Sequence, residues 1–518
     1  MARLTLLALF SALVGVHAQT VTITSAQTFQ TMDGFGLSEA YGSAADLYSL
    51  AYNYPAAPFD YLFSEGYAQF SILRLQIADG ANGILPTSPG SPDAEPTYVW
   101  DGDDNGQVWV ATQAQLGFGV KTIYAEAFSA PSFMKSDSGT LCGVTDSTCA
   151  SGDWRQAYAN FLTQYVLFYA QENISISHIG FLNEPEVANA TSSWMLSNAQ
   201  QAADFLPILA DTLAAANLST KIACCDAAGW DDQVALTAGL LSANALALVD
   251  TVTSHAYTSP PSSPIPHLSP TQRVWISEFA DVTVNDTTAD DWYATGEADE
   301  GMSWANTIHD AVVRAGVSAY LYRVGVGLES PATGYQPLVA TDFYAYQRLW
   351  AFTHWSRFVR PGAVRLGTSA TASHAGTLKH SAFLNPDGST IVQLLNNADA
   401  DSNVTVVAGD FAVSATPGPV AYASVQVYAA EGYAMDSIAT TFDAGTASVG
   451  LSVPAHGMVS LILSEAAQSG GSGSCLSPVW AQCGGQGYTG CQACLPGSTC
   501  VKENTYFSNC FPPGTTSF

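Results

Sequence analysis

The amino-acid sequence predicts an α/β protein built on a (β/α)8 barrel, with an attached β-sandwich domain and a small disulfide-rich module. Three observations lead to this prediction. Strand-like runs alternate with longer helical patterns up to about residue 355, as in barrels of parallel strands. Alternating apolar and polar residues between Gly, Pro, Asp and Asn then continue to residue 463, which is typical of a sandwich. Six cysteines follow within the last part of the chain.

The barrel is expected over residues 19–355. Helical patterns separate most of its strands, for example at Trp154–Gln171, Gln200–Ala215 and Ser303–Ala315. An open doubly wound sheet is the alternative, but it requires a Gly-rich phosphate loop after an early strand, and the sequence contains none. The eight expected strands are Met32–Gly36, Ser71–Ile77, Lys121–Ala127, Ile176–Leu182, Lys221–Asp226, Thr251–His255, Arg273–Glu278 and Ala319–Val324.

The side domain is expected over residues 356–463. Segment Val21–Phe29 is also strand-like, so residues 19–31 are a candidate strand of this domain rather than of the barrel. Residues 464–474 are rich in Gly and Ser and predict a flexible linker to a module at 475–513. The clearest strands of the side domain are Thr390–Asn396, Val404–Val407, Ser424–Tyr428 and His456–Leu463.

The module is too short to bury a sufficient core, so disulfides are expected to hold it together. Three aromatic residues, Trp480, Tyr506 and Phe507, stand near its ends. A small rigid scaffold that exposes several aromatic rings is suited to a flat apolar surface. A knottin-like inhibitor or toxin with buried aromatic residues is the alternative.

Residues 1–18 predict a secretory signal peptide, with Arg3, an apolar run and a cleavage site of small residues at Val16–Ala18. No other apolar run approaches the length of a membrane span. Secretion agrees with the ten cysteines, of which Cys142 and Cys149 are expected to close a short loop. Five glycosylation sequons also agree with it, at Asn173, Asn189, Asn217, Asn285 and Asn403.

The role of Cys224 and Cys225 stays undecided, because adjacent cysteines on a strand point to opposite faces. No histidine lies at ligand spacing beside them, so we expect no metal site, and the sequence indicates no cofactor. The formal net charge is −29, which disfavours nucleic acid and anionic membranes as partners. At 47% hydrophobic and 11% charged residues, the chain is not a disordered acidic protein, and we expect a monomer.

Two acidic residues lie at the ends of predicted barrel strands, where the chemistry of such barrels is located. Glu184 follows the fourth strand and Glu278 ends the seventh. Two carboxylates at one barrel mouth suit glycoside hydrolysis, in which one protonates the leaving oxygen and the other attacks or activates water. Alternatively, Glu184 is a solvated loop acid, as Glu186 is expected to be, and Glu278 is a buried salt-bridge partner of Arg74.

The module resembles the fungal family 1 carbohydrate-binding module, which binds crystalline cellulose. The resemblance rests on Trp480–Gly485 and Asn504–Cys510, and Asn509 departs from it where the family has Gln. It implies that Trp480, Tyr506 and Phe507 stack on sugar rings, with Gln482 and Asn504 beside them. It also implies the disulfides Cys475–Cys491, Cys483–Cys500 and Cys494–Cys510.

The barrel and side domain resemble glycoside hydrolase family 30, most of all its fungal xylanase subfamily 7. Four motifs in order carry this resemblance: Met32–Ala40, Ala125–Pro131, Phe181–Pro185 and Trp275–Glu278. The family is retaining, so the resemblance implies that Glu184 is the acid/base and Glu278 the nucleophile, with carboxyl groups about 5–5.5 Å apart. It implies further that Asn183 binds the sugar 2-hydroxyl and that Tyr257 lies by the nucleophile.

Two residues depart from the family pattern. Phe128 stands where Trp is common, which alters a stacking contact. Ser43 stands where branch-reading members have an Arg, and it has neither the charge nor the fork that holds a carboxylate. Arg323 is a candidate to compensate for Ser43, although a barrel ion pair is the favoured interpretation.

We therefore expect a secreted retaining β-1,4-xylanase, anchored to cellulose, that does not depend strictly on glucuronic acid branches of xylan. Release of xylobiose from chain ends is the expected companion behaviour. The alternatives are a glucuronoxylan-specific endo-xylanase, a β-1,6-glucanase of the same family and a non-catalytic wall-binding protein.

Overall fold

The computed structural model describes most of the chain. Contacts divide it into two compact units, 1–412 with 422–464 and 413–421 with 465–518, and each is described by itself. No helix in the described part of the chain is both long and apolar enough to pass through a membrane. The described residues are 19–39, 42–53, 57–188, 194–280, 291–327, 336–371, 377–407, 420–428, 435–437, 441–443, 448–465, 476–477, 482–484, 493–494, 499–502 and 508–511.

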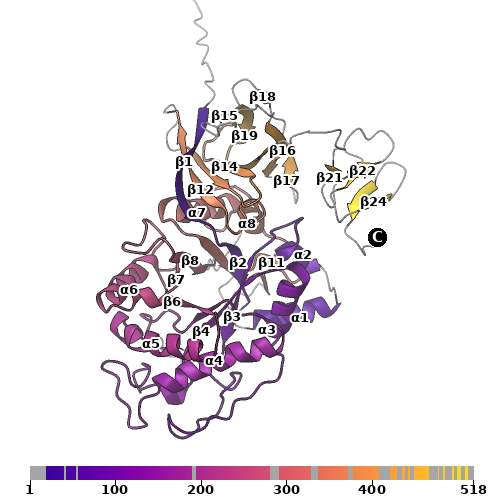
Figure 1. Cartoon of the computed structure of the whole chain (residues 1–518). Helices are drawn as coiled ribbons and strands as arrows, with labels where there is room; N and C mark the ends of the chain where they lie inside the picture. The colour runs from indigo at the N-terminus through magenta and orange to yellow at the C-terminus, as the bar shows by residue number, and fades with distance from the viewer. Residues whose placement is uncertain are drawn as a thin grey trace, which may run out of the picture. The chain divides into compact units, whose positions relative to one another are not determined.

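Eight parallel strands of the first unit close into a barrel, which confirms the predicted fold class (Figure 1). Their order around the barrel follows the sequence, and the last strand closes on the first with Gly34 opposite Ala319. The fourth strand is shorter than its expected run. The barrel strands are β2 (Gly34–Ser38), β3 (Ile72–Ile77), β4 (Thr122–Ala127), β5 (His178–Gly180), β6 (Lys221–Ala227), β7 (Thr251–His255), β8 (Arg273–Glu278) and β9 (Ala319–Arg323).

Helices connect most successive strands, as the alternating pattern predicts, while residues 256–272 between β7 and β8 contain none. The start of α5 shows how the sequence sets a boundary, because Asn198 and Gln201 form a capping box that pairs two backbone N–H groups. The helices are α1 (Ser43–Asn53), α2 (Ala57–Phe63), α3 (Gln107–Thr112), α4 (Arg155–Gln171), α5 (Ala199–Ala215), α6 (Trp230–Ser242), α7 (Gly301–Arg314) and α8 (Gln347–Ser356), with short helical segments at Gln113–Gly117, Ser132–Met134 and Leu246–Leu248.

The barrel strands carry an apolar layer with a polar layer above it. The buried apolar cluster comprises Ile72, Tyr124, Ala223, Trp275, Ala319 and Leu321. Side chains two residues further along a strand lie on the same face, toward its carboxyl end. Four of those positions hold the buried polar residues Arg74, Glu126, Ser277 and Arg323. The strand period therefore brings these groups together at the end of the barrel where active sites form.

The side domain contains a sheet of ten strands within the described residues, in the order β17-β16-β20-β14-β13-β12-β1-β15-β19-β18. Strand β1 (Gln19–Thr31) pairs antiparallel with β12 and parallel with β15, so the first described strand belongs to this sheet (Figure 1). The others are β12 (Val364–Ala370), β13 (Leu378–Leu384), β14 (Thr390–Asn396), β15 (Ser402–Val407), β16 (Val420–Tyr428), β17 (Met435–Ser437), β18 (Thr441–Asp443), β19 (Ser448–Val453) and β20 (Gly457–Glu465), and β10 (Val326–Gly327) with β11 (Val339–Ala340) forms a separate small pair.

Helix α8 lies between the barrel and this sheet, and each of its residues is buried. His354 on α8 contacts Ser460 of β20 through Nδ1 at 2.8 Å, and Gln393 of β14 donates to the His354 carbonyl at 2.6 Å. These polar contacts fix the last barrel helix against the middle of the side sheet.

The small module forms a three-stranded sheet, β22-β25-β24, and a short pair, β21 with β23. A disulfide joins Cys483 on β22 to Cys500 on β24, and Cys494 is also disulfide-bonded. Cys475 and Cys491, and most of the expected linker, lie outside the described residues. The strands are β21 (Leu476–Ser477), β22 (Gln482–Gly484), β23 (Ala493–Cys494), β24 (Thr499–Lys502) and β25 (Ser508–Phe511).

Candidate active site

Glu278 ends β8 and is the most strongly held acid of the barrel mouth. Its side chain is 1% exposed, and its Oε2 pairs with Nη1 of Arg74 on β3. Its Oε1 accepts from Arg323 Nη1 at 3.1 Å and from the Tyr257 hydroxyl at 3.0 Å. Both the salt bridge to Arg74 and the barrel ion pair of Arg323 are therefore present, and both converge on this carboxylate.

The charge state of Glu278 follows from these contacts. Burial would raise its pKa, but the positive charges of Arg323, His255 and Arg74 and the hydrogen bond from Tyr257 outweigh it. Together they lower the pKa of Glu278 to about 2. The group is therefore ionised at neutral pH, as a carboxylate nucleophile must be.

Glu184 lies in a different environment, just beyond the end of β5. Its backbone has a φ of 47°, in the left-handed region, and its N–H donates to the Asp226 carbonyl at 2.8 Å. Its side chain is 13% exposed and its Oε1 lies 3.0 Å from Nδ1 of His255. Glu184 is thus the more accessible of the two candidate catalytic carboxylates.

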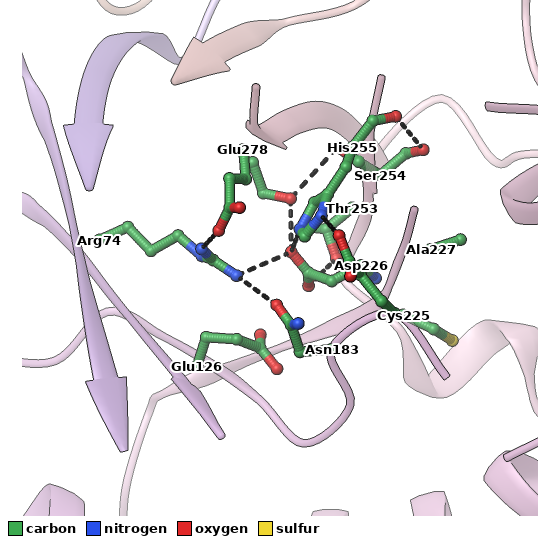
Figure 2. A network of polar contacts seen from close by, with 12 residues as sticks. Arg74, Glu126, Asn183, Cys225, Asp226, Ala227, Thr253, Ser254, His255 and Glu278 are labelled. Carbon is green, nitrogen blue, oxygen red and sulfur yellow. Dashed lines mark hydrogen bonds and ion pairs between the residues drawn. The ribbon is translucent and has the colours of Figure 1, made fainter. Parts of the chain in front are cut away.

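His255, at the end of β7, links Glu184 to a third acid, Asp226 on β6. Figure 2 shows His255 beside Asp226. Its Nε2 lies 3.3 Å from Oδ1 of Asp226, and both side chains are fully buried. Burial alone would lower the pKa of His255, but the charge of Glu278 and the contacts with Asp226 and Glu184 raise it to about 9. A positively charged imidazole therefore lies between the two acids at neutral pH.

The separation of the carboxylates distinguishes two hydrolytic mechanisms. One oxygen of Glu184, one of Glu278 and one ring nitrogen of His255 all lie within 4.8 Å of one another. Inverting glycosidases need carboxyl groups about 6.5–9.5 Å apart to admit a water, whereas retaining enzymes hold them about 5–5.5 Å apart. The same spacing is compatible with metal ligands, but two guanidinium groups already supply positive charge to Glu278.

Other residues named from the sequence lie around Arg74. Asn183 is buried and its Oδ1 accepts from Arg74 Nη2 at 3.0 Å. The Phe128 ring faces the same guanidinium, whose carbon lies 5.3 Å from the ring centroid. Arg74 thus positions Glu278, Asn183 and Phe128 relative to one another.

Ser43 begins α1 and is half-buried, and no contact of the described residues joins it to the two carboxylates. In the small module, Gln482 pairs with Asn509 across β22 and β25, while Trp480, Asn504, Tyr506 and Phe507 lie outside the described residues. Asn173, Asn217 and Asn403 are exposed, and Asn189 and Asn285 lie outside the described residues.

Both of the remaining cysteine pairs are disulfide-bonded, Cys142 with Cys149 and Cys224 with Cys225. The latter bond answers a question that the sequence left open. It lies on β6 directly before Asp226.

Sequence reasoning did not find Asp226, Tyr124 or Glu126 as members of this site, and it named His255 only as a strand end. The available signal was polar residues at alternate positions of otherwise apolar strands, as in Tyr124-Ala125-Glu126. That alternation indicates a face of the barrel, but it does not say which partners meet there.

Comparison with known proteins agrees with this geometry. Residues 92–257 match the model of O-glycosyl hydrolase family 30, residues 362–461 its β-sandwich domain, and residues 479–507 the fungal cellulose binding domain. The catalytic domain of GH30 xylanase C from Talaromyces cellulolyticus is 40% identical, with a TM-score of 0.78, and the match covers 86% of this chain and all of that one.

More distant relatives share the fold. A family 30 subfamily 8 xylanase from Clostridium acetobutylicum is 19% identical over 86% of this chain and 100% of its own, with a TM-score of 0.61. "Putative glucosylceramidase 2" of Caenorhabditis elegans is 24% identical over 72% of this chain and 76% of its own length. The 40% identical relative, matched over its full length, decides the assignment: the chain belongs to glycoside hydrolase family 30 and carries a fungal cellulose-binding domain.

Proposed function

We propose that this protein is a secreted, retaining β-1,4-xylanase in which Glu278 is the nucleophile and Glu184 the acid/base. The observation that carries the proposal is the contrast between the two acids. Glu278 is buried, ionised and held by Arg74, Arg323 and Tyr257, while the more exposed Glu184 has an oxygen within 4.8 Å of it. The similarity to a GH30 xylanase supports xylan as the substrate class.

In this mechanism the two carboxylates act in sequence. Oxygen of Glu278 attacks the anomeric carbon and forms a glycosyl ester, while Glu184 gives its proton to the leaving glycosidic oxygen. Glu184, now ionised, takes a proton from water, whose oxygen attacks the same carbon and releases Glu278. Asn183, fixed by Arg74, is suited to bind the sugar 2-hydroxyl, and Tyr257 keeps one oxygen of Glu278 in place.

Substitution of either acid tests this assignment. Glu278→Ala and Glu184→Ala should each remove nearly all hydrolysis of xylan, while thermal unfolding shows that the fold persists. Glu297→Ala, which changes an exposed acid before α7, is the matched control and should retain activity. If the wild type releases reducing sugar from β-1,6-glucan and not from xylan, the proposed substrate is wrong. If either acid variant keeps wild-type activity, the proposed catalytic role is wrong.

We also propose that the enzyme does not require glucuronic acid branches and that it releases xylobiose from chain ends. A carboxylate on a branch needs a cation or several donors to be held against water. Ser43 supplies no cation, and the guanidinium of Arg323 is already paired with Glu278. Because Ser43 is uncharged and Arg323 is engaged with Glu278, we expect the enzyme to tolerate unbranched xylan.

Finally, we propose that the module anchors the enzyme to cellulose through Trp480, Tyr506 and Phe507, close to xylan in the same wall. The match to the fungal cellulose binding domain supports this role. The signal-like residues 1–18 support secretion, and the net charge of −29 disfavours nucleic acid as a partner. We propose that the enzyme works as a monomer without a cofactor.

A further inference from the structure

A continuous series of polar contacts runs from the barrel interior to Glu184. Glu126 Oε2 contacts the Tyr124 hydroxyl, which also contacts Oδ2 of Asp226. Oδ1 of Asp226 lies 3.3 Å from Nε2 of His255, whose Nδ1 lies 3.0 Å from Glu184 Oε1. Figure 2 shows Glu126, Asp226 and His255 gathered in this network beside Arg74 and Asn183. Tyr124 and Glu126 have no part in the mechanism above.

The proton count at Tyr124 limits what these groups can be. A tyrosine hydroxyl has one proton to donate, yet the Tyr124 oxygen contacts a carboxyl oxygen on each side. One of the two acids must therefore bring a proton of its own. Asp226 is held as an anion, because its oxygens also accept from Thr253 Oγ1 at 2.6 Å and from the Ser277 hydroxyl. The additional proton consequently belongs to Glu126.

The surroundings of Glu126 support a neutral carboxyl. The side chain is fully buried, and its Oε1 has no hydrogen-bond partner among the described residues. Burial and the charge of Asp226 raise the pKa of Glu126 well above its usual range, in spite of the positive charge on Arg74. The titratable and charged groups that face it are Tyr124 on β4, Asp226 on β6, Arg74 on β3 and Tyr158 on α4.

Packing fixes the position of the Tyr124 hydroxyl between Glu126 and Asp226. Its ring belongs to the apolar barrel cluster and packs edge-on against Trp275, with the ring centroids 6.1 Å apart. The hydroxyl is therefore carried on a rigid support. Because neutral Glu126 donates to the Tyr124 oxygen, the single Tyr124 proton is directed to Asp226.

We propose that Tyr124 and neutral Glu126 are positioning residues for the acid/base: they hold Asp226, which fixes His255 against Glu184. This inference rests on the proposed function of Glu184. Neither residue touches the reacting atoms, and the effect is carried by Asp226 and His255. Without this positioning, Glu184 should protonate the leaving oxygen less well, while the attack by Glu278 should be unaffected.

Substrates whose leaving groups differ in basicity separate protonation by Glu184 from attack by Glu278. A phenolate leaving group needs protonation, whereas a dinitrophenolate departs without it, so kcat/KM for phenyl and dinitrophenyl β-xylobiosides isolates the acid. Tyr124→Phe should lower kcat/KM about tenfold or more for the phenyl substrate and less than about threefold for the dinitrophenyl substrate. An equal loss on both substrates, or no loss on either, would overturn the proposal.

Tyr165→Phe is the matched control, because Tyr165 on α4 is another buried tyrosine, and it donates to a different buried acid, Asp104, at 2.6 Å. It should leave the ratio of the two substrates unchanged. Glu126→Gln should keep both rates within about threefold and the alkaline limb of the pH profile in place, since an amide N–H donates where the neutral carboxyl did. A shift of that limb in Glu126→Gln would show that Glu126 is ionised and would contradict the proposal.

Infrared difference spectra provide a measurement that does not depend on the folding of Tyr124→Phe. At neutral pH, wild type minus Glu126→Gln should contain a protonated carboxylic acid band, and its absence would overturn the neutral assignment. The substrate is tested separately by wild-type hydrolysis of xylan. If the wild type cleaves β-1,6-glucan instead, the proposed function fails, and the same ratio measured on phenyl and dinitrophenyl β-glucosides still decides the role of Tyr124.

Discussion

Arg323 donates from Nη1 to Oε1 of Glu278 at 3.1 Å, and the side chains are 7% and 1% exposed. The only arginine that the sequence suggested as a reader of a charged xylan branch is thus paired with the proposed nucleophile. Its charge opposes the effect of burial on Glu278, so its first role is to keep that carboxylate ionised.

Replacement of Arg323 tests that role. Arg323→Met removes a positive charge that lowers the pKa of Glu278, so this pKa should rise from about 2, by about one unit or more. Because Glu278 must be ionised to attack, the acid limb of kcat/KM should move to higher pH. Arg314→Met, which changes an arginine that is 63% exposed on α7, should leave the profile in place. An unmoved acid limb in Arg323→Met would count against the assigned role.

The branch-specificity proposal is tested by giving the enzyme the missing cation. Wild type should cut glucuronic-acid-rich, arabinose-rich and linear xylan at rates within about tenfold of one another. Ser43→Arg should raise the preference for glucuronoxylan about 10- to 150-fold, the worth of a charge-assisted fork of roughly 1.5–3 kcal/mol. Ser43→Lys adds the charge without the fork and should give a smaller gain. Wild-type activity confined to glucuronoxylan would refute the proposal.

The tethering proposal concerns the small module alone. Trp480→Ala should weaken binding to crystalline cellulose, because each lost aromatic stack costs on the order of 1 kcal/mol or more. Hydrolysis of soluble xylan should not change, since the catalytic groups belong to the barrel. Pull-down on cellulose and reducing-sugar release measure the two effects separately. Full retention on cellulose by Trp480→Ala would show that the binding face lies elsewhere.

The positions of Glu184 and Glu278 could be predicted from the sequence because parallel barrel strands end at one rim. The barrel and the side sheet followed from the change in apolar periodicity. The partners within the rim did not follow, since Asp226 and Glu126 meet only after eight strands have closed with a fixed stagger. Strand alternation also left the pairing of Cys224 and Cys225 undecided, because it assumes a regular strand in which adjacent side chains point to opposite faces. In the structure the pairing of β6 with β7 shifts between Cys225 and Ala227.

The configuration of the first-formed product tests the central claim most directly. Retention requires that Glu278 form a covalent intermediate on the anomeric carbon. Water then attacks that carbon from the face that the leaving group occupied, and Glu278 is released. Proton NMR spectra taken in the first minutes of xylo-oligosaccharide hydrolysis should therefore show the β anomer before mutarotation produces the α anomer. If the α anomer appears first, the reaction inverts, and Glu278 is not the nucleophile.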